Sequence, residues 1–73
     1  MSKFRGTYMT QEQYTNWLVD NIKINTKHFM TAHYAELKMY YSNIIAQNQE
    51  ELVSLGFTWE QVEAIELDAM KTA

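Results

Sequence analysis

The sequence predicts an all-α protein of three helices, short-long-short, folded as a helical hairpin or small bundle. Apolar residues recur at steps of three and four over most of the chain, and there is no proline to interrupt a helix. The same helix-start signal also occurs twice, at Thr10 and at Thr58. The 73 residues are expected to form a single domain, 1–73, in which 1–9 are an irregular N-terminal segment because they show no period.

The first helix is expected over residues 11–24. Thr10 can accept a hydrogen bond from the first turn, and Gln13 supplies the return bond of a capping box. Met9 and Tyr14 occupy the two positions of a hydrophobic staple. One apolar face follows at helical spacing, made of Tyr14, Trp17, Leu18 and Ile22.

The second helix is expected over residues 27–55, after a break at Asn25 and Thr26. Asn tolerates a helix end, and Thr can cap a new start. A helix of this length would extend roughly 43 Å at 1.5 Å per residue. A continuous or kinked helix across the break is the alternative. The apolar stripe of the second helix is broader than two shorter flanking helices can cover.

The third helix is expected over residues 59–71, after a sharp corner formed by Gly56, Phe57 and Thr58. Gly56 can adopt the left-handed conformation that closes a helix, and Phe57 falls where a Schellman cap makes its apolar contact with Leu52. Thr58 can cap the next helix together with Gln61.

The composition points to an assembly larger than one chain. The chain is 47% hydrophobic and has no cysteine to form a disulfide. A chain of this size buries only about 60% of the surface that it exposes when unfolded. We therefore expect a homo-oligomer, with a two-fold dimer favoured. The residues expected near the centre of its interface are Tyr34, Leu37, Tyr41 and Ile44. The alternative is that this stripe binds a different protein.

The negative charge is concentrated in the second half of the chain. Residues 39–73 carry six carboxylates against Lys71 alone, a balance of −5, within a net charge of −3. Such an acidic end argues against nucleic acid as a partner, because phosphate contacts dominate that kind of binding. Such acidity is typical of a solvated helix face, and the alternative that we pursue is a docking surface for a basic protein. The residues assigned to this surface are Trp59, Glu60, Glu63, Glu66 and Asp68.

The sequence contains no pattern typical of a metal site, a cofactor site or an enzyme. His28 and His33 are five residues apart, so they do not share a helix face, and two ligands do not make a site. Only two glycines are present, which leaves no phosphate-binding loop, and no nucleophile lies in a known motif. No segment approaches the roughly 20 apolar residues of a membrane span, so a cytoplasmic protein is expected.

The order of a long aromatic-rich helix from Tyr34 to Leu55, a Gly56-Phe57-Thr58 corner and a short amphipathic helix from Trp59 to Met70 resembles small phage-encoded helical proteins. The resemblance covers about half of the chain. It implies a non-enzymatic protein that binds and inhibits a larger host protein, in host takeover or in countering host defence. It also implies that the protein acts in the host cytoplasm.

Two other functions remain open at this point. An oligomer can sequester a small nucleotide-like ligand between chains, with tyrosines stacking on it and Lys23, Lys27 or Lys38 binding its phosphates. This alternative requires those lysines to converge on a pocket. The other alternative is a structural component that assembles only with itself.

Overall fold

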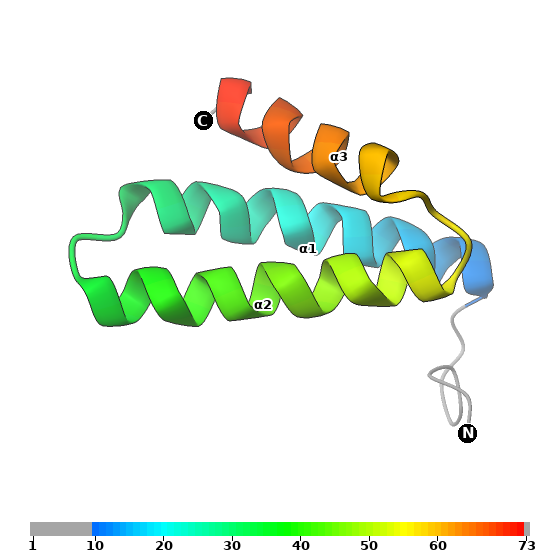
Figure 1. The fold of residues 1–73 in the computed structure, drawn as a ribbon, viewed down its shortest axis with the longest axis horizontal. Coiled ribbons are helices and arrows are strands. Elements are labelled where there is room, and N and C mark those ends of the chain that lie inside the picture. The colour runs from blue at the N-terminus through cyan, green and yellow to red at the C-terminus, as the bar shows by residue number, and fades with distance from the viewer. Residues whose placement is uncertain (1–9, 73) are drawn as a thin grey trace.

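Three α-helices follow one another without strands in residues 10–72, the part of the chain that the structure, a computed structural model, describes. They are α1 (Gln11–Thr31), α2 (Ala35–Ser54) and α3 (Trp59–Thr72). α1 and α2 form an antiparallel hairpin, and α3 lies across one side of it, running in roughly the same direction as α1 (Figure 1). The predicted all-α class of three helices is confirmed. The irregular segment predicted for residues 1–9, which includes Met9 of the staple, lies outside the described residues.

The break predicted at Asn25 and Thr26 is wrong. Both residues are buried inside α1, which continues to Thr31. The side chain of Asn25 is satisfied inside the helix, because its Nδ2 donates to the carbonyl oxygen of Asn21, 2.7 Å away, one turn earlier. α1 and α2 therefore have 21 and 20 residues, and α3 has 14, so the predicted short-long-short order is also wrong.

The turn between α1 and α2 lies instead at residues 32–34, where the chain has neither glycine nor proline. The Ala32 amide donates to the Phe29 carbonyl at 3.4 Å, and Lys38 Nζ donates to the same oxygen at 3.3 Å. A cation at the C-terminal end of a helix also interacts favourably with the helix dipole. Lys38 of α2 thus caps α1, so no local turn signal is needed there.

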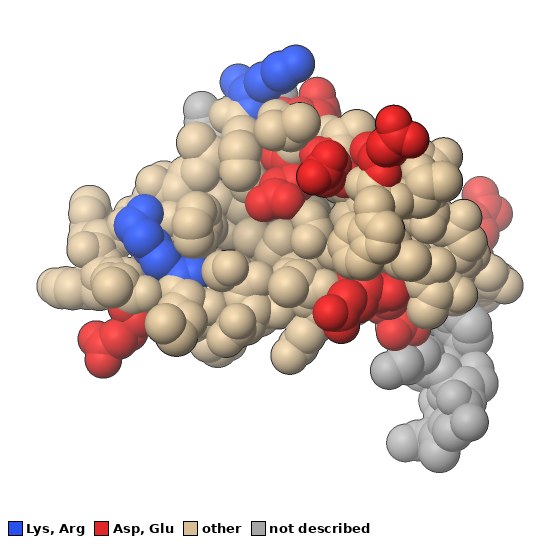
Figure 2. Space-filling model, in the orientation of Figure 1, with Lys and Arg blue, Asp and Glu red and all other residues tan. Residues whose placement is uncertain are grey.

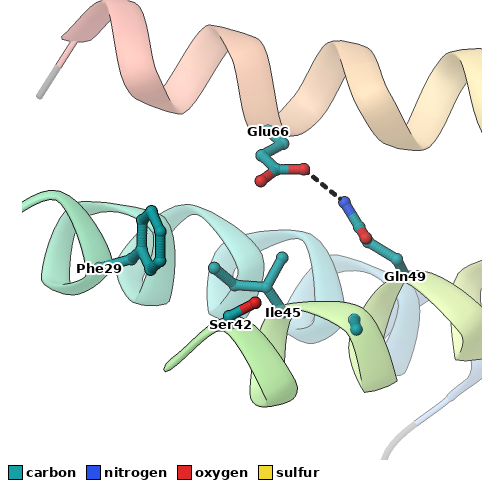
Figure 3. Close-up of a pocket in the computed structure, with 6 residues that line it drawn as sticks. Phe29, Ser42, Ile45, Gln49 and Glu66 are labelled. Carbon is teal, nitrogen blue, oxygen red and sulfur yellow. Dashed lines mark hydrogen bonds between the residues drawn. The ribbon is translucent and has the colours of Figure 1, made fainter. Parts of the chain in front are cut away.

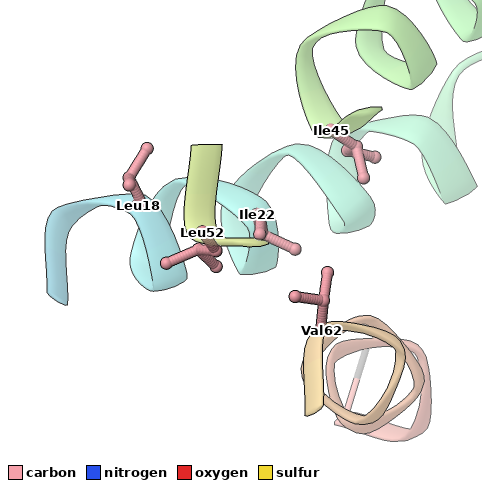
Figure 4. Close-up of a cluster of buried hydrophobic side chains, with 5 residues drawn as sticks. All are labelled: Leu18, Ile22, Ile45, Leu52 and Val62. Atoms are coloured by element: carbon pink, nitrogen blue, oxygen red, sulfur yellow. The ribbon is translucent and has the colours of Figure 1, made fainter. Parts of the chain in front are cut away.

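One hydrophobic core joins the three helices. Its fully or nearly buried members are Leu18 and Ile22 of α1, Ile45 and Leu52 of α2, and Val62 of α3 (Figure 4). α1 contributes to contacts with both other helices, whereas α2 and α3 touch over a shorter stretch. The central helix of the fold is therefore α1. The sequence had predicted that the second helix, as the longest, would be the central one.

The helix starts follow the sequence signals closely. Gln13 N donates to Thr10 Oγ1 at 3.1 Å, and Thr10 N donates to Gln13 Oε1 at 2.9 Å. The same pair of bonds, with the same lengths, joins Thr58 and Gln61 at the start of α3. Both predicted capping boxes are present.

Within the described residues, no helix is long and apolar enough to cross a bilayer.

Candidate functional site

The corner between α2 and α3 fixes where the acidic helix begins. Phe57 N donates to the Leu52 carbonyl at 3.1 Å, and Gly56 N donates to the Val53 carbonyl at 3.0 Å. These are the two bonds of a Schellman motif, and Gly56 has the positive φ, 113°, that the motif requires. α3 therefore starts at a defined position beside the end of α2, as the residues of the corner predicted.

One side of α3 carries an aromatic residue and carboxylates above α2. Trp59, Glu63 and Glu66 are separated by four and three residues, so they share a stripe of the helix. Glu66 Oε1 accepts a hydrogen bond from Gln49 Nε2 of α2 at 2.7 Å, which shows that this stripe faces α2. Trp59 is 54% exposed and Glu63 is exposed. We call this stripe the acidic flank.

The five residues predicted for the partner surface do not all lie together. Trp59, Glu63 and Glu66 form the acidic flank, and Glu60 is exposed next to it. Asp68 follows Trp59 by nine residues, about two and a half turns, which places it on the opposite side of α3. Acidic side chains gather over α3 and over the end of α2 nearest the corner (Figure 2).

A small pocket opens between the helices beside Glu66 of the acidic flank. Its volume is about 110 Å³, and its lining consists of Phe29 from α1, Ser42, Ile45, Ala46 and Gln49 from α2, and Glu66 from α3. The hydrogen-bonded pair of Gln49 and Glu66 closes one end, and the Phe29 ring stands toward the other (Figure 3). The pocket thus combines an aromatic wall, an apolar floor and one carboxylate.

None of the three lysines proposed for a phosphate site, Lys23, Lys27 and Lys38, lines this pocket. Lys38 Nζ lies 5.0 Å from the centroid of the Phe29 ring and is held by the Phe29 carbonyl. Lys23 and Lys27, four residues apart, share one side of α1, and neither of them lines the pocket. The pocket has a carboxylate where a nucleotide would need a cation, which weighs against the nucleotide alternative.

A second surface lies on the other side of the hairpin. His28 of α1 stacks on Tyr41 of α2 with ring centroids 5.2 Å apart, and Tyr40 meets Tyr41 edge to face at the same distance. Trp17 and Ile24 lie within about 40° of His28 around α1, so they belong to the same side. Both are exposed, at 49% and 53%.

This second surface is turned away from α3. On α2, the stripe of Leu37, Tyr41 and Ile44 is rotated by roughly 120° from the pocket residues Ser42 and Gln49. We call this surface the aromatic face. Its members, none of which is Lys, Arg, Asp or Glu, are Trp17, Ile24, His28, Leu37, Tyr40, Tyr41 and Ile44.

The structure brings together three of the four residues predicted for self-association. Leu37, Tyr41 and Ile44 lie on the aromatic face, and Leu37 is 41% exposed. Tyr34 instead precedes α2 as its N-cap residue and is exposed in the turn. The contribution of α1 to this face was missed, because ending the first helix at residue 24 separated His28 from Trp17.

One ionisable group beside the aromatic face is perturbed. Burial raises the pKa of the Tyr14 hydroxyl, and the Glu51 carboxylate, which accepts its hydrogen bond, raises this pKa further. Tyr14 also stacks on Trp17, with centroids 6.1 Å apart. The contact between Tyr14 and Glu51 joins the start of α1 to the end of α2 and is a structural contact.

In residues 10–72, no group of three or more His, Cys, Asp or Glu side chains is placed to hold a metal ion. His28 is engaged with Tyr41, and His33 lies in the turn between α1 and α2.

The pocket residues Phe29, Ser42, Ala46 and Gln49 were not predicted from the sequence. No family model, no curated protein and no solved structure matches this chain.

Proposed function

We propose that this chain is a non-enzymatic interaction protein, a phage-type inhibitor or modulator that binds a basic surface of a larger host protein in the host cytoplasm. The observation that carries the proposal is the acidic flank, in which an exposed Trp59 stands beside Glu63 and Glu66. Aromatic side chains supply much of the energy of protein interfaces, and complementary charge supplies steering and specificity.

The charge distribution supports a basic protein as the partner. In residues 10–72, nine carboxylates stand against four lysines, and acidic side chains gather over α3 and the nearby end of α2 (Figure 2). At physiological salt such a surface attracts cations over about 8 Å. A partner that normally binds nucleic acid would offer a matching basic track, which the acidic flank would occupy.

Affinity capture tests this proposal. The immobilised chain is exposed to a bacterial extract beside a variant that carries Trp59→Ser, Glu60→Gln and Glu63→Gln, all at exposed positions. The proposal expects a protein that the wild type retains, that the variant does not, and that salt releases. Retention of the same proteins by both chains would contradict it.

We propose further that a second copy of the chain covers the aromatic face, as the composition led us to expect. Two copies with a net charge of −3 repel one another, so they associate best through a surface without charged groups. The aromatic face is such a surface, whereas the acidic flank is not. The expected particle has twice the 8.7 kDa mass of one chain, which light scattering on a size-exclusion column measures. In this arrangement the two acidic flanks of a dimer remain free for partners.

A further inference from the structure

We propose that the pocket between α2 and α3 is a receptor for one arginine side chain of the protein partner. This inference rests on the proposed function, because it names the group by which a basic surface is recognised. It adds a defined point of attachment to an otherwise diffuse electrostatic attraction. The pocket contributes a carboxylate, two neutral acceptors and an aromatic ring.

The polar groups of the pocket suit a ligand that only donates hydrogen bonds. Glu66 is held in place by the bond from Gln49 Nε2 to its Oε1, so the carboxylate is already oriented before a ligand arrives. Its other oxygen, the amide oxygen of Gln49 and the hydroxyl of Ser42 are further acceptors in the lining. A guanidinium has five N–H donors in a rigid fork and no acceptor, which matches this set.

The aromatic wall favours a flat cation. Phe29 already has the ammonium of Lys38 at 5.0 Å from its ring centroid, so positive charge is accommodated beside this ring within the chain itself. A guanidinium is planar and more weakly hydrated than an ammonium, and it stacks on aromatic rings. Arginine is therefore preferred to lysine as the occupant.

The size of the pocket favours the end of a side chain over a whole metabolite. Sites for drug-sized ligands and cofactors have volumes of about 300–1,000 Å³. The volume here is about 110 Å³, too small for a nucleotide. A side chain presented by a partner protein needs only this much space, because the partner provides the remaining contact area on the acidic flank.

Lys38 lies beside the pocket, over the Phe29 ring, and opposes a second positive charge. Its Nζ is tied to the Phe29 carbonyl, outside the pocket lining. Replacing Lys38 by Gln should therefore strengthen arginine binding by roughly twofold, since one repulsive charge at the protein surface is removed. This gain distinguishes a pocket site from attraction to the distant carboxylates.

The test is a titration of the ¹⁵N-labelled chain with acetyl-arginine amide, followed by amide chemical shifts. Acetyl-citrulline amide, which has nearly the same shape without the charge, is the control ligand. We expect saturable shifts centred on Ser42, Ala46 and Gln49. Glu66→Gln should weaken binding about fivefold, as expected for a charge-assisted hydrogen bond, whereas Glu60→Gln should change it by less than about twofold.

A second variant covers the case in which Glu66→Gln disturbs the fold. Ala46→Leu adds bulk at an exposed position of the pocket lining without changing the charge. Leucine has nearly the same helix propensity as alanine, so α2 should be preserved. We expect it to weaken arginine binding by more than about threefold, with an unchanged helical circular dichroism spectrum. Equal affinity for arginine in wild type and Ala46→Leu would overturn the pocket site.

The outcomes separate this inference from the proposed function. Equal effects of Glu60→Gln and Glu66→Gln, with shifts spread over all the carboxylates, would overturn the pocket and leave the acidic surface in place. Equal binding of the citrulline control would also overturn it. Failure of both acetyl-arginine amide and a longer arginine-glycine peptide to bind would overturn the pocket and the proposed function together.

Discussion

Replacement of Gly56 by alanine isolates the cost of the corner between α2 and α3. Gly56 has φ 113°, and a Cβ added there would meet no atom within 4 Å. The substitution therefore creates no steric clash with the rest of the protein. Its whole effect in the folded state comes from forcing an L-residue into a region of backbone conformation that favours glycine.

The expected magnitude follows from two opposing effects. A left-handed conformation costs an L-residue about 1–2 kcal/mol. Alanine also restricts the unfolded chain more than glycine does, which returns about 0.4–1 kcal/mol. The net loss of unfolding free energy is about 1 kcal/mol, equivalent to roughly 4–8 °C in Tm for a domain of this size.

Thermal and urea unfolding followed by circular dichroism measures this loss. Because the site is open, Gly56→Ser and Gly56→Lys should lose about as much as Gly56→Ala, and D-alanine, introduced by chemical synthesis, should lose less than L-alanine. An unchanged Tm for Gly56→Ala, or a loss that grows with side-chain size from Ala to Lys, would refute the reasoning from backbone strain.

Three further predictions concern the core, the Tyr14 contact and the aromatic face. Thr26→Val should raise the unfolding free energy by about 1 kcal/mol in urea titrations, because Thr26 Oγ1 is fully buried and has no hydrogen-bond partner among the described residues. A lower unfolding free energy in this variant would show that the hydroxyl makes a hydrogen bond. The raised pKa of Tyr14 means that its proton is held more tightly in the folded state, so this contribution to stability is intact below about pH 9 and is lost as the pH rises through and above 10. Tyr14→Phe should flatten that part of the pH profile, and an unchanged profile would contradict the assignment. Ile24→Glu should halve the mass seen by light scattering while Leu67→Glu, equally exposed on α3 at 55%, should leave it unchanged; equal effects would remove the aromatic face as the dimer interface.

The helix starts and the corner were predictable because their determinants are local. Thr10, Thr58 and Gly56 act through bonds to residues at most four positions away, so the sequence around each of them contains the whole signal. The turn at residues 32–34 has no such signal. Its cap comes from Lys38, nine residues after the carbonyl that it binds, and only the hairpin brings the two together.

The difference between local and long-range determinants also explains which functional surfaces could be predicted from the sequence. Trp59, Glu63 and Glu66 share a helix face by their spacing alone, so the acidic flank was accessible from the sequence. The pocket required Phe29 of α1, Ser42 of α2 and Glu66 of α3 to meet, and no local pattern predicts that meeting. The misplaced break at Asn25 also hid the aromatic face, because it separated His28 from Trp17 and Ile24, which lie on the same side of α1.

Fluorescence of Trp59 during binding of a basic peptide tests the proposed function most directly. The chain has two tryptophans, and Trp17→Phe, on the opposite side of the hairpin, leaves Trp59 as the only reporter on the acidic flank. With a short peptide of alternating arginine and glycine, we predict a saturable change in emission and an affinity that falls as salt is raised. The double variant Glu60→Gln, Glu63→Gln in the same background should bind more weakly. A Trp59 signal that does not respond to the peptide, or an affinity that is unaffected by salt and by the double variant, would contradict an acidic docking surface.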